Sequence, residues 1–313
     1  MPEFITDITT ILRQEPTFFI TLSVFLGLMV GSFLNVVIHR LPKMMEKEWE
    51  NSCLELQGKE APATEKYTLV TPRSACPQCG HKISALENIP VISYLFLQGK
   101  CKGCKTPISL RYPVIEALTG ILIGLVSWKF GYSTTTLAAW AFTLALIVLT
   151  FIDFDTQLLP DDITLPLLWL GLLFNLSTGF IDLKSAVVGA ILGYLILWSV
   201  YWLFKIITGK EGMGYGDFKL LAAIGAWFGW QLLPAVILLS SVIAAVVGIG
   251  ITLYRKRRLL TWLVKHKTAP KILIGIIVII RNHSDPMPFG PYLALGGISA
   301  LFFGQQLASF YLP

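Results

Sequence analysis

Long apolar runs, separated by polar segments, dominate the chain. They cover residues 18–38, 113–130, 137–152, 163–176, 186–207, 220–230, 233–253 and 289–310. Runs of this kind indicate transmembrane helices, because about 20 apolar residues are needed to cross a bilayer. The runs 163–176 and 220–230 are shorter, so we expect those helices to be tilted or to extend into their flanking loops. The pattern predicts an all-α polytopic membrane protein with about eight transmembrane helices.

Two other segments stand apart from these runs. Residues 272–280 form an apolar run that is too short to span a bilayer, and we interpret it as interfacial or as part of a soluble hairpin. Residues 39–111 form a long polar segment, the only one with the length of a small domain. We therefore predict three parts: an N-terminus with the first helix (1–38), a small polar domain (39–111) and a seven-helix membrane domain (112–313).

Composition agrees with a membrane protein. The chain is 54% hydrophobic and 14% charged, whereas about 25% charged residues is usual for a soluble domain. Its net charge of +6 would also suit a nucleic-acid partner. With eight spans, however, every Lys and Arg except Arg13, Lys129 and Lys184 lies on one side of the membrane. Lys and Arg mark the cytoplasmic side, so we predict cytoplasmic large loops, termini on the other side, and a charge that reports topology and contact with anionic lipid.

Four of the five cysteines form two C-x2-C pairs within the polar domain, Cys76 with Cys79 and Cys101 with Cys104. Two such pairs at this separation are typical of a structural zinc site, since each tight turn directs two sulfurs at one point. Gly80 and Gly103 suit these turns. An iron centre of the rubredoxin type and metal-free redox thiols are the alternatives. Disulfides are disfavoured because the cytoplasm is reducing.

The remaining potential ligands change this prediction little. Cys53 stands apart from both pairs, and we expect it to be a free thiol. His81 is a possible substitute ligand, although four sulfurs already complete the shell. A closed shell of four sulfurs leaves no position for water, so this metal would be structural and not catalytic.

The loop at residues 153–162 holds four acidic residues and no basic one, on the side that is otherwise rich in Lys and Arg. Asp161 and Asp162 follow Pro160 and suit the start of a helix, where acids are stabilised. Asp153 instead ends an apolar run, and the dipole at a helix C-terminus disfavours an anion. An ionisable group in an unfavourable place at the membrane edge is a functional candidate. We expect Asp155 to be solvated.

A second candidate acid follows a glycine-rich bend. Residues 212–219 read G-M-G-Y-G-D-F-K, and an apolar run starts directly after them. Asp217 is therefore either a helix cap or a functional group. It lies on the same predicted membrane edge as Asp153. If the two carboxyl groups come together they can share one proton, so that the ionised one activates water and the protonated one polarises a peptide carbonyl. The glycines would let a substrate backbone lie against Asp217.

This arrangement favours aspartic-protease chemistry. The histidines are scattered in basic loops and have no obvious Ser or Cys partner. The rival from another class is a transporter in which Asp153, Asp155 and Asp217 carry protons or cations. Transporters hold such acids near the bilayer midplane and often show internal repeats. Here the acids lie at one edge and no repeat is visible, so the peptidase is favoured.

Several motifs, in order along almost the whole chain, give a more specific result. They are G-S-F-L-N-V-V-I-H-R-L-P at 31–42, both C-x2-C pairs, E-N-I-P at 87–90, R-Y-P at 111–113, F-I-D-F-D with L-P-D at 151–161, the glycine bend at 212–219 and P-F-G-P-Y at 288–292. With these motifs the chain resembles the bacterial type IV prepilin peptidases, the prepilin leader peptidase/N-methyltransferases. The G-x-G-D alone would also suit presenilin-like proteases, but their Tyr-Asp pair on the preceding helix is absent.

The resemblance implies a bifunctional inner-membrane enzyme. Its catalytic aspartates correspond to Asp153 and Asp217, and its zinc ligands to the four paired cysteines. The family cuts a short basic leader from prepilins and pseudopilins at the cytoplasmic membrane face. It then methylates the new N-terminal residue, usually phenylalanine, with S-adenosylmethionine. A glycine needed for methyl transfer corresponds to Gly99. The chain has no glycine-rich strand–turn–helix for an adenosyl cofactor, so methyl transfer rests on the resemblance. The long segment 254–288 departs from many relatives.

Two further charged residues have alternative interpretations. Glu116 lies inside the second apolar run, where a charge is costly. It would either pair with Arg111 or a nearby lysine, or help to hold substrate or cofactor. Lys219 follows Asp217 by two positions and either marks topology or acts on a neighbouring acid.

Overall fold

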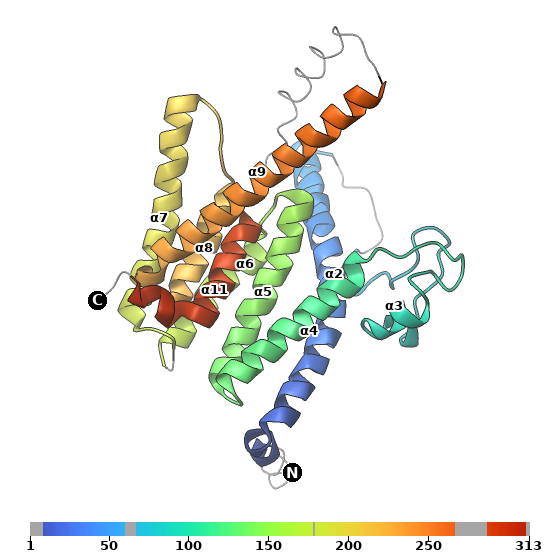
Figure 1. Cartoon of the computed structure of the whole chain (residues 1–313), viewed down its shortest axis with the longest axis horizontal. Coiled ribbons are helices and arrows are strands. Elements are labelled where there is room, and N and C mark those ends of the chain that lie inside the picture. The colour runs from blue at the N-terminus through green and yellow to red at the C-terminus, as the bar shows by residue number, and fades with distance from the viewer. Residues whose placement is uncertain (1–8, 60–66, 178, 267–286, 311–313) are drawn as a thin grey trace.

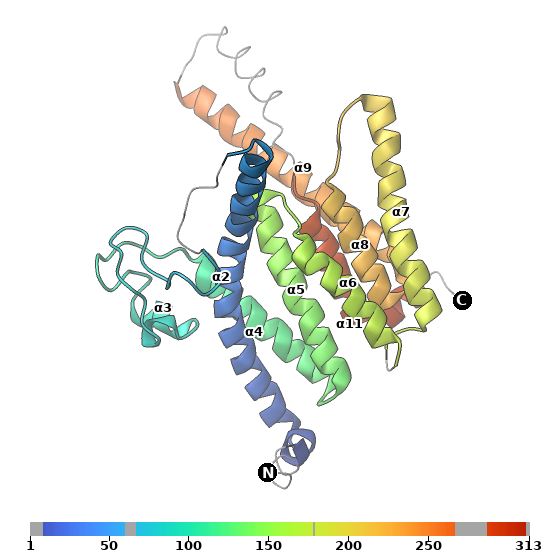
Figure 2. The ribbon, with the colours of Figure 1, turned by 180° about the vertical axis from the view of Figure 1, so that it is seen from behind.

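The computed structural model describes residues 9–59, 67–177, 179–266 and 287–310, with the backbone alone for 255–266. Long helices run side by side from α2 (Pro16–Leu56) at one edge to α7 (Leu183–Thr208) at the other (Figures 1 and 2). Between them lie α4 (Arg111–Phe130), α5 (Thr134–Thr156), α6 (Asp161–Asn175), α8 (Tyr215–Phe228), α9 (Leu233–His266) and α11 (Gly290–Ser309). The apolar run 272–280 lies outside the described residues.

Each of the eight predicted apolar runs overlaps one of these helices, which confirms the all-helical prediction for the described residues. Within the described ranges, five segments are long and apolar enough to cross a membrane: Pro16–Leu56, Arg111–Phe130, Thr134–Thr156, Leu183–Thr208 and Trp230–Tyr254. The chain is therefore a multi-pass membrane protein. The number of eight crossings stays a prediction.

Two helices extend more than ten residues past the ends of their apolar runs. We predicted that the first helix ends at residue 38, but α2 has 41 residues and continues to Leu56. At about 1.5 Å per residue it is about 60 Å long, twice the hydrocarbon core. Its second half is rich in Lys and Glu, which are good helix formers, so the helix continues until Gly58 adopts a left-handed φ of 68°. For the same reason α9 continues past the predicted end at residue 253 to His266.

Helices α2 and α4 approach each other closely through glycines. A Cβ added to Gly27 would lie 2.9 Å from the Gly120 Cα, and one added to Gly124 would lie 2.5 Å from Val24 Cγ2. Small residues at such contacts let two backbones pack within a membrane, where there is little hydrophobic force between helices. These glycines therefore fix the pair of helices that flanks the polar domain.

Helix α8 forms the centre of the bundle. Its residues from Leu220 to Phe228 are all buried, as expected for a helix that is apolar on every face. Trp227 is fully buried, and its Nε1 donates a hydrogen bond to the Leu167 carbonyl at 2.9 Å. The helix starts at Tyr215, so the predicted extension into the preceding loop is present and includes Asp217. It ends at Phe228, and Gly229, with a φ of 79°, then turns the chain toward α9.

The polar domain forms a lobe beside α2 and α4, made of residues 67–110 (Figure 1). It contains two cysteine turns and the short helices η1 (Leu86–Asn88) and α3 (Ile92–Phe96). Arg40 of α2 is buried and binds the first residues of the lobe. Its guanidinium donates to the carbonyls of Thr68 at 2.8 Å and Pro72 at 2.6 Å.

Candidate active site and metal centre

Asp153 lies in the last turn of α5, at the helix end where the sequence placed it. Its carbonyl accepts the N–H of Gln157, which adopts a left-handed conformation and ends the helix. The Asp153 side chain is only 4% exposed. Its Oδ2 accepts a hydrogen bond of 3.0 Å from the N–H of Gly290, the first residue of α11. A buried acid is thus held by the start of another helix.

Asp217 lies in the first turn of α8 and is 7% exposed. Its N–H donates to the Gly214 carbonyl at 3.3 Å, which closes the turn that starts the helix. Its side-chain Oδ1 is buried and has no hydrogen-bond partner among the described residues. A buried carboxyl oxygen without a partner is costly, so this atom is available for a ligand or substrate.

The two acids come together where α5, α8 and α11 converge. Their carboxyl groups are close enough to interact electrostatically. Leu159 packs against Gly216, which precedes Asp217, and against Gly290, which binds Asp153. A Cβ on Gly216 would be 2.7 Å from Leu159 Cβ, and one on Gly290 would be 3.2 Å from Leu159 Cδ1. The fold therefore brings Asp153 and Asp217, distant in sequence, to one buried site.

The three glycines before Asp217 have different surroundings. A Cβ on Gly212 would meet the Phe204 ring at 2.8 Å, and one on Gly216 would meet Leu159. At Gly214 the nearest side-chain atom is Asp217 Oδ2, at 3.9 Å. Gly212 and Gly216 thus permit close packing, whereas Gly214 leaves space beside the carboxyl group.

The other charged groups near the site form ion pairs. Both guanidinium Nη atoms of Arg111 lie 2.6 Å from the carboxylate oxygens of Asp155. As predicted, Asp155 is exposed, and its side chain also pairs with Arg111. Lys219 donates to both Asp161 oxygens at 2.7 Å, so its partner is neither catalytic candidate. Within the described part of the chain, these pairs leave Asp153 and Asp217 as the buried acids of this edge without a counter-ion.

Glu116 lies at the junction between the membrane helices and the lobe. Its Oε2 accepts the N–H of Val91 at 2.7 Å, so the interpretation that it pairs with Arg111 was wrong. Val91 has a φ of 59°, which is strained for a β-branched residue. Asn35 of α2 adds a second polar contact here, donating to the Tyr112 carbonyl at 3.2 Å. The Glu116 contact thus holds the lobe to α4, and the Asn35 contact joins α2 to α4 beside it.

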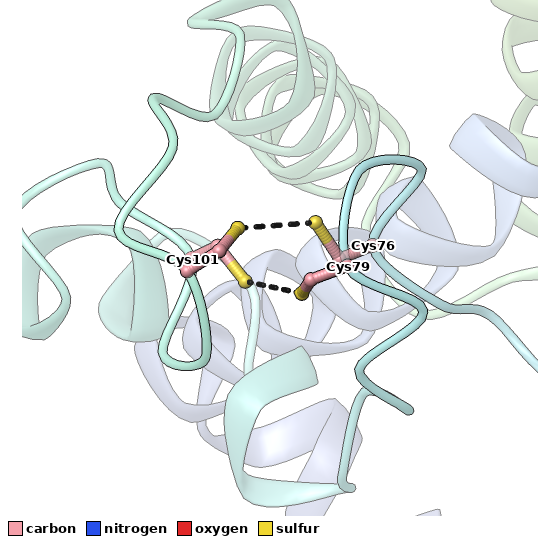
Figure 3. Close-up of side chains that lie close together, drawn as sticks. Cys76, Cys79 and Cys101 are labelled. Carbon is pink, nitrogen blue, oxygen red and sulfur yellow. Dashed lines mark hydrogen bonds between the residues drawn. The ribbon is translucent and has the colours of Figure 1, made fainter.

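The four paired cysteines meet in the lobe, with their sulfurs within 4.8 Å of one another. The Cys76 and Cys104 sulfurs are 3.8 Å apart, and those of Cys79 and Cys101 are 3.9 Å apart. Figure 3 shows the sulfurs of Cys76, Cys79 and Cys101 turned toward a common point. Four thiolates at about 2.3 Å around a tetrahedral Zn²⁺ would be about 3.8 Å apart. The cluster therefore fits zinc, whereas Cys53 is exposed on α2 and outside it.

Both cysteine turns have the same backbone form. The N–H of Cys76 donates to the His81 carbonyl at 2.9 Å, and that of Cys101 to the Thr106 carbonyl at 2.8 Å. The residue four positions after the first cysteine is left-handed in each turn. It is Gly80 in the first (φ 70°) and Lys105 in the second (φ 60°). Gly103 lies inside the second turn, as predicted, but without a positive φ. An added Cβ there would lie 3.4 Å from the Cys79 sulfur and 3.3 Å from His81 Cβ, so Gly103 allows close packing.

Glu87 ties the two cysteine turns together. It accepts the Ser84 N–H at 3.0 Å, and it lies 3.1 Å from His81 Nε2 and 3.2 Å from Lys102 Nζ. The Ser84 hydrogen bond, followed by the Lys102 and His81 side chains, lowers the pKa of Glu87 to about 2 despite partial desolvation. His81 is therefore engaged by a carboxylate beside the sulfur cluster.

Gly99 connects α3 to the second cysteine turn. Its φ is 65°, and an added Cβ would lie 2.7 Å from the Tyr94 hydroxyl. Its carbonyl accepts the Ile108 N–H at 2.7 Å. Both the conformation and the lack of space require glycine here.

Sequence reasoning assigned no role to two features of the site. It did not give Gly290 a contact with Asp153, although a glycine between Pro288 and Pro291 was a possible signal. It also did not connect Glu116 to Val91. Both contacts use backbone N–H groups, which leave no trace in residue identity.

Comparisons with known proteins show the class of protein to which the chain belongs. A model of the bacterial peptidase A24 N-terminal domain matches residues 25–130, and a model of the type IV leader peptidase family matches residues 140–249. No solved structure matches the chain. The chain belongs to the type IV leader peptidase family and is an enzyme.

Its curated relatives are named more specifically. A prepilin leader peptidase/N-methyltransferase of Aeromonas salmonicida (strain A449) is 50% identical over 302 residues, covering 95% of each chain. One of Pseudomonas aeruginosa is 49% identical, covering 96% of each. One of Burkholderia pseudomallei (strain 1026b) is 47% identical, covering 93% of this chain and 86% of the relative.

Proposed function

We propose that this enzyme cleaves the leader peptide from prepilins and pseudopilins by a two-aspartate mechanism at the cytoplasmic membrane face. The meeting of Asp153 and Asp217 carries the proposal. They come from different helices, are almost fully buried, and have no counter-ion among the described residues. Two such carboxyl groups share one proton, which is the state that aspartic proteases use.

The chemistry needs no other group. The ionised carboxyl takes a proton from water while the oxygen of that water bonds to the scissile carbonyl carbon. The protonated carboxyl gives its proton to the carbonyl oxygen. When the C–N bond breaks, the proton taken from water passes to the leaving amine. A hydroxyl proton of the tetrahedral intermediate then restores the second carboxyl. Both aspartates return to their starting states.

The substrate class follows from the relatives' names and from the position of the site. A prepilin has a basic leader next to an apolar helix, so its scissile bond lies at the boundary of membrane and water. The exposed pairs Arg111–Asp155 and Lys219–Asp161 lie on the same helix ends as the buried acids, which agrees with a site near that boundary. The distribution of Lys and Arg supports a cytoplasmic orientation of this edge.

The test uses matched aspartate variants in a leader-cleavage assay with a prepilin in detergent or vesicles. Asp153→Asn and Asp217→Asn are expected to abolish cleavage while the protein stays folded and membrane-bound. Asp155→Asn, which changes an exposed acid two residues from Asp153, is expected to retain it. Full cleavage by either Asp153→Asn or Asp217→Asn would refute the proposal.

We also propose that the enzyme methylates the new N-terminal residue with S-adenosylmethionine, and that the lobe takes part. The relatives' names support the activity, and the position corresponding to the family's methyl-transfer glycine is Gly99. Zn²⁺, held by the four paired cysteines, would supply structural stability alone, since their closed shell leaves no ligand position. Gly99→Ala is expected to lose methylation, measured with labelled S-adenosylmethionine and a processed pilin, and to retain cleavage. Equal methylation by Gly99→Ala would refute the role of this residue.

A further inference from the structure

We propose that the two aspartates have fixed and different roles: Asp153 is the ionised base that activates water, and Asp217 is the acid that protonates the substrate carbonyl. We further propose that the N–H of Gly290 sets this assignment as a positioning group. The inference rests on the proposed peptidase function and adds which carboxyl group is the base and which is the acid.

The first argument is the hydrogen bond from α11 to Asp153. Gly290 N–H donates to Oδ2 at 3.0 Å, from the first position of a helix of 20 residues. An N–H at a helix N-terminus stabilises the anionic form of the carboxyl group that accepts its bond. It also orients Asp153, because one oxygen is fixed and the other is left to bind water.

The second argument is the oxygen of Asp217 that no donor reaches. Its Oδ1 is buried without a partner among the described residues, where an ionised oxygen would be especially unfavourable. Asp217 is itself in the first turn of α8, so the dipole of that helix also favours an anion. However, its N–H is directed to Gly214 and not to its carboxyl group. The backbone N–H of Gly214 acts on the Asp217 carboxyl group but leaves Oδ1 buried and unpaired. An anion on Asp217 would therefore carry the cost of that unpaired oxygen.

The third argument is the space around each acid. A Cβ at Gly290 would be 2.6 Å from Asp153 Oδ2, so this side of Asp153 is closed by the α11 backbone. Beside Asp217, a Cβ at Gly214 would meet nothing nearer than Oδ2 at 3.9 Å. A substrate carbonyl therefore has room beside Asp217, where it must lie to accept a proton from that carboxyl group.

Charged groups on the neighbouring elements do not change this order. Arg111 of α4 is neutralised by Asp155, and Asp161 of α6 by Lys219 of α8. His39 of α2 lies next to Lys43. From α11, Tyr292 donates its hydroxyl hydrogen to the Met287 sulfur. Among the described residues, Asp217 is thus the ionisable group that acts on Asp153.

The experiment removes the N–H group of Gly290. Glycolic acid incorporated in place of residue 290 replaces the amide by an ester, which deletes the N–H and adds no side chain. The pH profile of kcat/KM for leader cleavage is then measured. Its acidic limb reports the base and its alkaline limb the acid. We expect the acidic limb to move to higher pH by about one unit, with the alkaline limb and KM unchanged.

The matched control is the corresponding ester at Tyr292, whose N–H donates to the Phe289 carbonyl at 3.1 Å in the same helical turn. It should move neither limb. An unchanged acidic limb in the residue 290 ester would overturn the proposal, and a moved alkaline limb would reverse the two roles. Neither result would affect the peptidase function, which fails only if Asp153→Asn or Asp217→Asn retains cleavage.

A genetic variant provides a second test. Gly290→Ala places a methyl group against Asp153 Oδ2, and it should lower kcat at least tenfold with little change in KM. Gly297→Ala is the control in the same helix, since its Cβ would meet only the side chains of Ile224 and Leu146, at 3.2 Å. Similar kcat values for both variants, in proteins of equal thermal stability, would contradict the positioning role of Gly290.

Discussion

The contact between Glu116 and Val91 gives a quantitative prediction about the lobe. Glu116 belongs to α4 and is 9% exposed, and it is the acceptor for the Val91 N–H at 2.7 Å. Val91 directly precedes α3 and has a strained φ of 59°. Glu116→Ala removes the acceptor and leaves both the N–H unpaired and the strain uncompensated. The lobe should then open more often while the helix bundle stays intact.

The magnitude follows from general hydrogen-bond energetics. Leaving a buried N–H without its acceptor costs about 1–3 kcal/mol. The Val91 bond is half-buried, so we expect a cost of about 1 kcal/mol and opening about 5 times more frequent. Glu116→Gln keeps an acceptor oxygen and should change opening much less. Val91→Gly removes a strain of about 1–3 kcal/mol, so it should partly restore a closed lobe when combined with Glu116→Ala.

Hydrogen exchange of the purified membrane enzyme measures this opening. Amides of residues 86–108 should exchange faster in Glu116→Ala by the stated factor, whereas those of α8 should keep their protection. Leader cleavage should persist and methyl transfer should fall. Equal exchange rates in Glu116→Ala and Glu116→Gln would refute the reasoning, as would equal acceleration in α8, because the contact would then not hold the lobe specifically.

Two further predictions concern metal and packing. The enzyme should contain about one Zn²⁺ per chain. Chelation or Cys76→Ser should make the lobe sensitive to protease before the helices, whereas Cys53→Ser should have no effect. A lobe that resists protease equally without metal would contradict this. Gly216→Ala should destabilise the site, because its Cβ would lie 2.7 Å from Leu159, whereas Gly214→Ala should fold normally. Equal melting temperatures for these two variants would show that the glycine at 216 is not required for packing.

The hydrophobic pattern predicted the helices well because a bilayer leaves few alternatives for long apolar runs. It failed at the ends of α2 and α9, where charged residues end the apolar run but not the helix. Hydropathy reports the solvent around a segment, whereas helix continuation depends on backbone propensity and on the next breaker. The cysteine spacing was equally informative, because each C-x2-C turn is a local structure.

The residues of chemical interest were recognisable from their order along the chain. An acid at the end of an apolar run is energetically unfavourable, so its presence indicates a function. Two C-x2-C pairs match the ligand spacing of a metal site. Their interactions, in contrast, depend on tertiary packing. Packing paired Arg111 with Asp155 and directed Glu116 to a backbone N–H. It also brought Gly290 to Asp153 across 137 positions of sequence. Local patterns determine each helix and its buried face, whereas the partner of a buried polar group depends on where distant backbone groups lie after the helices pack.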